Sequence, residues 1–393
     1  MQVFKVNRIC KLFMFIIALF VFGMPVDIDA NIDVWKMDEF MVSVWGGVGE
    51  NPYRFFEAPS KTIKQTNVNV VMTHQVRLGL CRQLGIKALL LDVEPSHAAQ
   101  YRNDPAVWGY FLTDEPTAKD YQTLADKVRQ FWITDPSHPT YINLGEGLTS
   151  QHNKYLEMVR PSLLSYDYYP WSWGFERYFE RLEEYRNGAL KYDIPLLSFI
   201  SPNTATKEEI KKYGVQYVPN NNQERLRFVL YTTLAYGIKG IQWFHGRGVW
   251  DVSKNYELTT SGRDIALLNS ELRILGESLI KMKSTMVFHT APIPKSTQLI
   301  PKDFWLQVYD SGLMIGVFED NQAKEYIMIV NKDYTKQRFT KVSFPYHKLC
   351  KEKLNKVYGT WTEEAMTKDP IPELLLSINP GDGELLKCNS ISY

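Results

Sequence analysis

The chain has 393 residues, which is too long for one small domain and suits a barrel of about 250 residues with a smaller module. Hydrophobic residues make up 45% and aromatic residues 13%, enough for a large core and for rings that stack on ligands. Residues 1–30 hold three basic and two acidic side chains, so the rest carries 42 charges of each sign. This balance excludes electrostatic attraction to nucleic acid or to an anionic membrane.

The first thirty residues resemble a secretory signal. Basic side chains between positions 5 and 11 precede the apolar run Leu12–Met24, and Ala30 could be the last residue before cleavage. The run is shorter than the about 20 apolar residues that span a bilayer. We therefore expect an exported protein, periplasmic or extracellular, with no stable membrane insertion after cleavage. Because Ile28 fits the small-residue cleavage pattern imperfectly, an uncleaved membrane anchor stays open.

Downstream of the signal the chain has three cysteines, and their spacing does not suit a metal site. Cys81 lies in an apolar helical stretch and is expected to be a buried thiol. Cys350 and Cys388 fall in the C-terminal part and could pair in an oxidising compartment, although the sequence alone does not decide this. We expect no metal and no cofactor.

From about residue 40 short apolar strands alternate with amphipathic helices, which is typical of a parallel sheet with crossover helices. Eight strands are predicted, at Phe40–Gly46, Val68–Thr73, Ala88–Asp92, Trp108–Thr113, Thr140–Leu144, Leu163–Tyr168, Pro195–Ile200 and Gly240–Phe244. Five helices are predicted, at Val76–Leu84, Ala118–Trp132, Phe175–Leu190, Gln223–Tyr236 and Arg263–Met282. The pattern indicates an α/β fold, a (β/α)8 TIM barrel over residues 31–283. Its weak point is Asn51–Gln65, a poor helix with two prolines.

After Met282 short strands follow one another with turn residues between them and no long helix. The predicted strands are Phe304–Tyr309, Leu313–Phe318, Glu325–Asn331, Lys341–Phe344, Lys356–Tyr358 and Leu374–Ile378. This pattern predicts a C-terminal antiparallel β-sandwich over residues 284–393.

In a (β/α)8 barrel the active site lies at the carboxyl ends of the strands. The side chains expected there are carboxylates, aromatic rings and histidines. They are Trp45, Glu50, His74, Asp92, Glu94, Asp114, Glu115, Glu146, Asp167, Tyr169, Trp243 and His245. No nucleophile elbow, phosphate-binding loop or dinucleotide fingerprint is present in the sequence.

The segment Trp108–Pro116, which reads Trp-Gly-Tyr-Phe-Leu-Thr-Asp-Glu-Pro, resembles the fourth strand of clan-A glycoside hydrolases. The residue before the glutamate is Asp114, as in some relatives of the family 42 β-galactosidases. Residues 234–244 are similar to the last helix and strand of those relatives. The resemblance implies a barrel that hydrolyses glycosidic bonds, with Glu115 as the catalytic acid. Without the resemblance, Asp114 and Glu115 could instead cap the following helix.

The predicted seventh strand departs from that family. Clan-A retaining enzymes carry a nucleophilic glutamate at its end, whereas Pro195–Pro202 has no carboxylate. The resemblance thus supports an acid without supplying its partner, and it leaves open a catalytically inactive carbohydrate-binding barrel. Asp167, which lies among aromatic residues at the end of the sixth strand, is the leading second catalytic carboxylate. It could also bind a sugar hydroxyl or bond neighbouring backbone.

The expected substrate is an oligosaccharide or polysaccharide, cleaved by general acid catalysis with a carboxylate pair. A barrel acting on a non-sugar substrate is a weaker alternative. The residues expected to bind substrate are Trp45, Asp114, Glu146, Tyr169, Trp171, Trp243 and His245. In the relatives a cis peptide often follows the tryptophan that Trp243 resembles.

Overall fold

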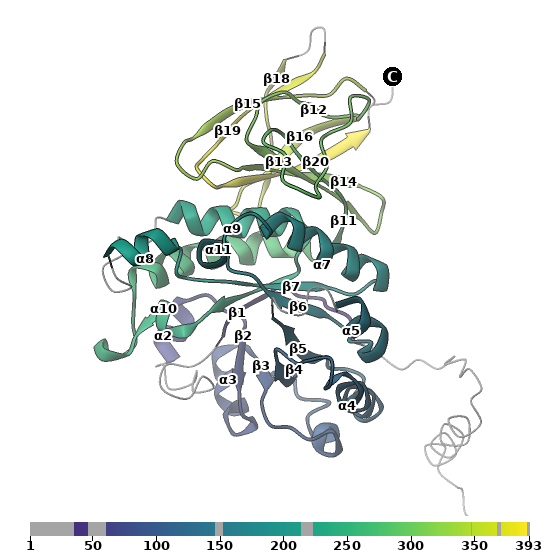
Figure 1. Cartoon of the computed structure of the whole chain (residues 1–393), viewed down its shortest axis with the longest axis vertical. Coiled ribbons are helices and arrows are strands. Elements are labelled where there is room, and N and C mark those ends of the chain that lie inside the picture. Colours follow the sequence, from purple (N-terminus) through teal and green to yellow (C-terminus); the bar gives the residue numbers. More distant parts are fainter. Residues whose placement is uncertain are drawn as a thin grey trace, which may run out of the picture. The chain divides into compact units, whose positions relative to one another are not determined.

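A computed structural model describes residues 35–45, 60–145, 152–213, 223–346, 348–367 and 371–390 (Figure 1). The predicted signal, Glu50 and Glu146 lie outside these residues. Trp35–Tyr393 forms one compact unit. None of the helices in the described part of the chain is both long and apolar enough to cross a membrane.

The N-terminal part of this unit is an eight-stranded parallel barrel with the order β1-β8-β7-β6-β5-β4-β3-β2. Its strands are β1 (Met41–Trp45), β2 (Val70–Thr73), β3 (Lys87–Leu90), β4 (Val107–Asp114), β5 (Thr140–Leu144), β6 (Leu164–Asp167), β7 (Leu196–Ile200) and β8 (Gly240–Phe244). All eight predicted strands are confirmed, and so is the barrel fold.

Asn69 joins the first and last strands of this order, β1 and β2. Its backbone N–H donates to the Val42 carbonyl at 3.0 Å, and its Oδ1 accepts from the Val42 N–H at 2.7 Å. Its Nδ2 donates to the Phe40 carbonyl at 2.9 Å. One buried side chain therefore takes the place of regular strand pairing at the barrel seam.

Helices cover the outside of the barrel because each strand alternates one outward apolar residue with one inward residue. The helices are α2 (Ser60–Gln65), α3 (Leu78–Leu84), α4 (Tyr121–Thr134), α5 (His152–Val159), α6 (Pro170–Trp173), α7 (Tyr178–Tyr192), α8 (Lys207–Tyr213), α9 (Gln223–Ala235), α10 (Gly246–Val249) and α11 (Thr260–Leu279). The five predicted helices correspond to α3, α4, α7, α9 and α11. The short helices α5 and α8 were not predicted, and a short hairpin pairs β9 (Trp250–Asp251) with β10 (Glu257–Leu258).

Inward-facing side chains fill the barrel interior from the amino-terminal end of the strands. They include Met41, Val70, Leu89, Trp108 and Tyr141, which form one buried cluster. The Trp35 ring packs edge-on against Trp108, with ring centres 5.9 Å apart. The backbone N–H of Trp35 donates to the Pro136 carbonyl, in the loop before β5. The interior is thus packed from the amino-terminal end, and polar side chains gather towards the carboxyl ends of the strands.

The C-terminal part contains two antiparallel sheets, in the orders β11-β13-β14-β20-β16-β17 and β12-β15-β19-β18. The strands are β11 (Met282–His289), β12 (Gln307–Val308), β13 (Leu313–Asp320), β14 (Glu325–Asn331), β15 (Arg338–Ser343), β16 (Lys348–Leu354), β17 (Trp361–Glu363), β18 (Met366–Thr367), β19 (Glu373–Ile378) and β20 (Gly383–Ser390). Their inner faces share one apolar core, so the predicted sandwich is confirmed. The predicted domain boundary after residue 283 falls inside β11.

Two details of the sandwich differ from the prediction. The predicted strand Lys356–Tyr358 is a turn, because Oδ1 of Asn355 accepts from the N–H groups of Val357 and Tyr358. The strands β11, β16, β17, β18 and β20 were not predicted. Of these, β16 and β20 pair directly, and Cys350 and Cys388 stand opposite each other and form a disulfide. The pairing that the sequence left open is therefore present.

The sandwich packs against the barrel helices. Gly316 on β13 lies so close to α9 that a Cβ atom there would stand 2.3 Å from the Ala235 carbonyl oxygen. Tyr236 shares a 3.0 Å hydrogen bond with His289, which is buried at the end of β11. Arg227 on α9 pairs with Asp382 before β20 at 3.3 Å. The contact is therefore close-packed and partly ionic.

Candidate active site

A β-bulge in β4 turns its last residues towards the barrel interior. Phe111 pairs with Tyr141 and Asp114 with Asn143, so β4 uses one residue more than β5 over this stretch. Without the extra residue, Phe111 and Asp114 would lie on opposite faces of the sheet, since side chains alternate along a strand. The bulge lets both face inward at the carboxyl end of the barrel.

Glu115 lies one residue beyond β4, and contacts with Asn143 and Gly145 set its position. Its N–H donates to the Asn143 carbonyl at 2.9 Å, and its backbone adopts a left-handed φ of 47°. Its side chain lies on Gly145, where a Cβ atom would stand 2.6 Å from Oε1 of Glu115 and 2.7 Å from its Cδ. The carboxylate therefore occupies the space that the missing side chain of Gly145 leaves free.

A chain of side-chain hydrogen bonds supports Asp114. Nδ2 of Asn143 donates to Oδ1 of Asp114 at 3.1 Å. The Ser165 hydroxyl donates to Oδ1 of Asn143 at 3.0 Å and lies 2.6 Å from the Tyr141 hydroxyl. Asn143, Ser165 and Tyr141 are all buried. Three neighbouring strands thus fix the orientation of one carboxylate.

Asp167 brings a further carboxylate to the same end of the barrel. Leu163 before β6 and Tyr169 after it belong to the interior cluster, and Ser165 on β6 bonds inward to Asn143. Alternation along the strand therefore places Asp167 inward as well. Asp167 is 7% exposed, and its buried Oδ1 has no hydrogen-bond partner among the described residues. A buried oxygen without a partner is costly, and it is tolerated where a ligand or water can supply the missing donor.

The electrostatics link these carboxylates. Burial raises the pKa of Asp167 to about 7, and the charges of Glu115 and Asp114 act in the same direction. Desolvation and the charge of Glu115 also raise the pKa of Asp114, against the hydrogen bond from Asn143. The charge of Glu115 therefore acts on both Asp114 and Asp167, and the charge of Asp114 also acts on Asp167.

Aromatic side chains surround this group. The Trp45 ring packs edge-on against Phe111 at 5.4 Å and against Phe199 at 5.1 Å. Tyr169 stacks on Phe244 with ring centres 5.4 Å apart. Trp45 and Tyr169 are buried, at 4% and 8% exposed, so the structure brings both to the barrel interior but leaves them little free ring surface.

Two predicted stacking residues lie elsewhere. Trp243 on β8 is fully buried and faces outward, in the apolar layer between the strands and the helices. Its indole N–H donates to the Asn269 side chain on α11 at 2.8 Å. Trp171 packs against Phe175, and the Arg225 guanidinium lies 4.9 Å from its ring. Both rings stabilise contacts between elements, so the expected substrate-binding role does not fit either position.

His245 follows β8 at the carboxyl end of the barrel. Its Nδ1 accepts from the Arg247 N–H at 3.1 Å, and burial and the Arg247 charge lower its pKa. A neutral ring in this arrangement carries its proton on Nε2 and can donate from there. The peptide between Phe244 and His245 is cis, one residue beyond the position expected from the relatives. Glu146, which was expected to bind substrate, lies outside the described residues.

Sequence reasoning missed the residues that hold the carboxylates, namely Tyr141, Asn143, Gly145 and Ser165. A signal for one of them exists, because Asn143 is an amide side chain between the apolar residues Ile142 and Leu144 of β5. Ser43 and Gln242 were also missed. They pair across β1 and β8, and their buried side-chain polar atoms have no direct partner among the described residues.

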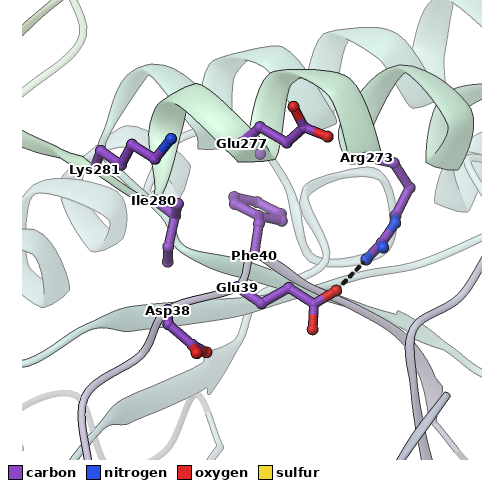
Figure 2. Close-up of a pocket in the computed structure, with 8 residues that line it drawn as sticks. Asp38, Glu39, Phe40, Arg273, Glu277, Ile280 and Lys281 are labelled. Atoms are coloured by element: carbon purple, nitrogen blue, oxygen red, sulfur yellow. Dashed lines mark hydrogen bonds and ion pairs between the residues drawn. The ribbon is translucent and has the colours of Figure 1, made fainter. Parts of the chain in front are cut away.

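A hollow of about 290 Å³ lies at the other end of the barrel, between the chain before β1 and the end of α11 (Figure 2). Figure 2 shows Glu39 in this hollow paired with Arg273, at 2.8 Å. Although partial burial opposes it, hydrogen bonds from Asn69 and Arg273 hold the pKa of Glu39 below its ordinary value. The amino-terminal end of such a barrel serves stability, so we do not place the active site there.

Within the described ranges, no three His, Cys, Asp or Glu side chains are grouped so that they could hold a metal ion.

No family model and no curated protein sequence matches this chain. Its structure is similar to a candidate alpha-galactosidase/melibiase from Bacteroides fragilis, with a TM-score of 0.50 and 11% identity over 90% of this chain and 80% of that chain. A GH27 β-L-arabinopyranosidase from Geobacillus stearothermophilus aligns with a TM-score of 0.49 and 8% identity, over 90% of this chain and 97% of that chain. At such identities the similarity to the first of these shows a shared fold.

Proposed function

We propose that this protein is a glycosidase that uses Glu115 and Asp167 as its carboxylate pair. The observation that carries the proposal is that both residues stand at the carboxyl ends of barrel strands and that the charge of Glu115 raises the pKa of Asp167. Glycosidases need two carboxyl groups with different protonation states flanking the scissile bond. The name of the alpha-galactosidase/melibiase neighbour supports the glycosidase class, while the choice of these two residues rests on the site itself.

The pair leaves two assignments of roles. The resemblance of Trp108–Pro116 to clan-A enzymes gives the acid role to Glu115. The raised pKa of Asp167, about 7, instead favours Asp167 as the group that holds a proton at neutral pH. Under either assignment, the other carboxylate activates water or attacks the sugar.

A panel of aryl glycosides and natural glycans tests the proposal directly. We expect turnover of at least one substrate, and a loss of about 10²–10⁴-fold in kcat for Glu115→Gln. Glu157→Gln is the matched control, since Glu157 lies on the exposed face of α5 and forms a surface ion pair with Lys191. Wild-type activity in Glu115→Gln would remove that residue from the mechanism.

Leaving-group dependence separates the two roles. A variant without its general acid should still cleave dinitrophenyl glycosides, whose leaving group needs no protonation, and should fail on unactivated glycans. Comparing Glu115→Gln with Asp167→Asn on both kinds of substrate therefore identifies the acid. Loss of both activities in one variant marks that residue as the base or nucleophile.

One observation favours a second function, a barrel that binds carbohydrate without cleaving it. The seventh strand, Leu196–Ile200, carries no carboxylate and is followed by Ser201 and Pro202. Glycan binding without turnover across the whole panel would support this second function over the first.

We also propose that the protein is exported. The buried Cys350–Cys388 disulfide supports this, because such bonds persist in oxidising compartments. Expression with the full leader should release a protein whose first residue is Asn31. A cell-associated chain that retains its first thirty residues would contradict cleavage.

A further inference from the structure

The end of β5 and the residue that follows it contact the two carboxylates at the end of β4 in different ways. Asn143 on β5 donates a hydrogen bond to Asp114, the last residue of β4. The bare backbone of Gly145, one residue beyond β5, accommodates Glu115, one residue beyond β4. We infer that Asn143 and Gly145 are positioning residues, which set the orientation of Asp114 and the place of Glu115 for the reaction. This inference rests on the proposed function.

The contact at Gly145 leaves no room for a larger residue while the Glu115 side chain keeps its position. A Cβ atom would approach three atoms of the Glu115 side chain to within 2.6–2.8 Å, closer than real Cβ contacts. Because the Glu115 N–H is tied to Asn143, the backbone of Glu115 cannot easily retreat. The carboxylate must therefore rotate away from its place when Gly145 becomes alanine.

The contact at Asn143 is electrostatic. Its amide donor stabilises the charged form of Asp114, against desolvation and the charge of Glu115. The amide is in turn oriented by Ser165, whose hydroxyl donates to its Oδ1, so its NH2 group must point to Asp114. The Asn143 side chain therefore orients that carboxylate and partly offsets the rise in its pKa.

The first test uses Gly145→Ala. We expect kcat to fall on the order of 10²-fold, as for a reacting group displaced by about 1 Å, with a much smaller change in KM. Gly79→Ala on α3 is the matched control, because nothing lies within 4 Å of a Cβ atom there. A kcat within threefold of wild type, in a folded Gly145→Ala protein, would overturn the role of Gly145.

The second test uses Asn143→Asp, which keeps the shape of the side chain and its acceptor for Ser165 but replaces the donor with an oxygen. We expect the titration of Asp114, followed by NMR of 13C-labelled aspartate carboxyls, to move to higher pH. Asn389→Ala removes a similar bond to Glu352 in the sandwich, 2.9 Å long, and should leave Asp114 unchanged. An unchanged Asp114 titration in folded Asn143→Asp would overturn the role of Asn143.

The carboxyl titration needs no substrate, so the two proposals fail separately. A shifted Asp114 titration in a protein that cleaves no glycan would support the contact between β5 and β4 and reject the glycosidase. Normal turnover in both Gly145→Ala and Asn143→Asp would instead reject the positioning role and leave the glycosidase standing.

Discussion

Asp167 and Glu115 are coupled across the barrel end, because the charge of Glu115 adds to the burial that raises the pKa of Asp167 to about 7. The ordinary value for the unfolded chain is 3.8. Between these values the folded protein holds a proton that the unfolded chain has released. Asp167 therefore lowers the free energy of unfolding progressively as the pH rises from about 4 to about 7. Above pH 7 this destabilisation is complete, because the buried carboxyl group is then charged.

Asp167→Asn should remove this cost. At pH 8 we expect the variant to be more stable than the wild type, by up to about 4 kcal/mol, whereas the difference should be small near pH 4. Urea denaturation at both pH values measures it. Asp92→Asn is the control, since Asp92 is highly exposed beyond β3. A variant less stable than wild type at pH 8 would contradict the raised pKa of Asp167.

The barrel could be predicted because the apolar residues of its strands and helices recur with the spacing typical of each element. All eight strands were predicted, and their carboxyl ends gave the list of candidate site residues. Within that list, the resemblance to clan-A enzymes singled out Glu115, and the aromatic neighbours of Asp167 together with the lack of a carboxylate on the seventh strand singled out Asp167. The β4 bulge could not be predicted, since no residue type marks it. Its presence decides that Phe111 and Asp114 both face inward.

The direction of the Trp243 side chain could not be predicted from the sequence either. In Gly240–Phe244 only Gln242 is polar, so the sequence alone did not decide which residues face the interior. In the structure Gln242 belongs to the inward set, and Trp243 points to α11. Alternation fixes the relative directions along a strand, but only packing determines which set faces inward.

The seam residue Asn69 gives a stability prediction. Asn69→Ala leaves the Val42 N–H and the Phe40 carbonyl without the side-chain partners that they have in a buried seam. We expect the free energy of unfolding to fall by roughly 2–5 kcal/mol, from two unpaired buried groups. Asn187→Ala on the exposed face of α7 should change it by less than about 0.5 kcal/mol. Equal effects in guanidinium unfolding would show that the Asn69 bonds do not hold the seam.

The Cys350–Cys388 bond gives a redox prediction. It links β16 to β20 across 38 residues of sequence, so its reduction should lower the free energy of unfolding by about 2–4 kcal/mol. The double variant Cys350→Ala/Cys388→Ala should show no dependence on reductant in the same thermal melt. In denatured, unreduced protein that begins at residue 31, thiol titration should find Cys81 alone. Three reactive thiols would mean that the bond does not form.

The close approach of Gly316 to α9 predicts how tightly the sandwich packs on the barrel. A side chain at Gly316 would meet the Ala235 carbonyl oxygen, a backbone atom that cannot move without the helix. Gly316→Val should therefore lower the free energy of unfolding by at least about 1–3 kcal/mol, the usual cost of overpacking. Ser377→Val, on the exposed face of β19, is the matched control, and there the β-branched side chain should be tolerated. A Gly316→Val protein as stable as wild type would show that this contact contributes little to the fold.

The same contact predicts the behaviour of the barrel alone. A chain ending at Met282 should be poorly soluble, since it exposes the face of α9 that the sandwich covers. A stable, fully active barrel without the sandwich would contradict this.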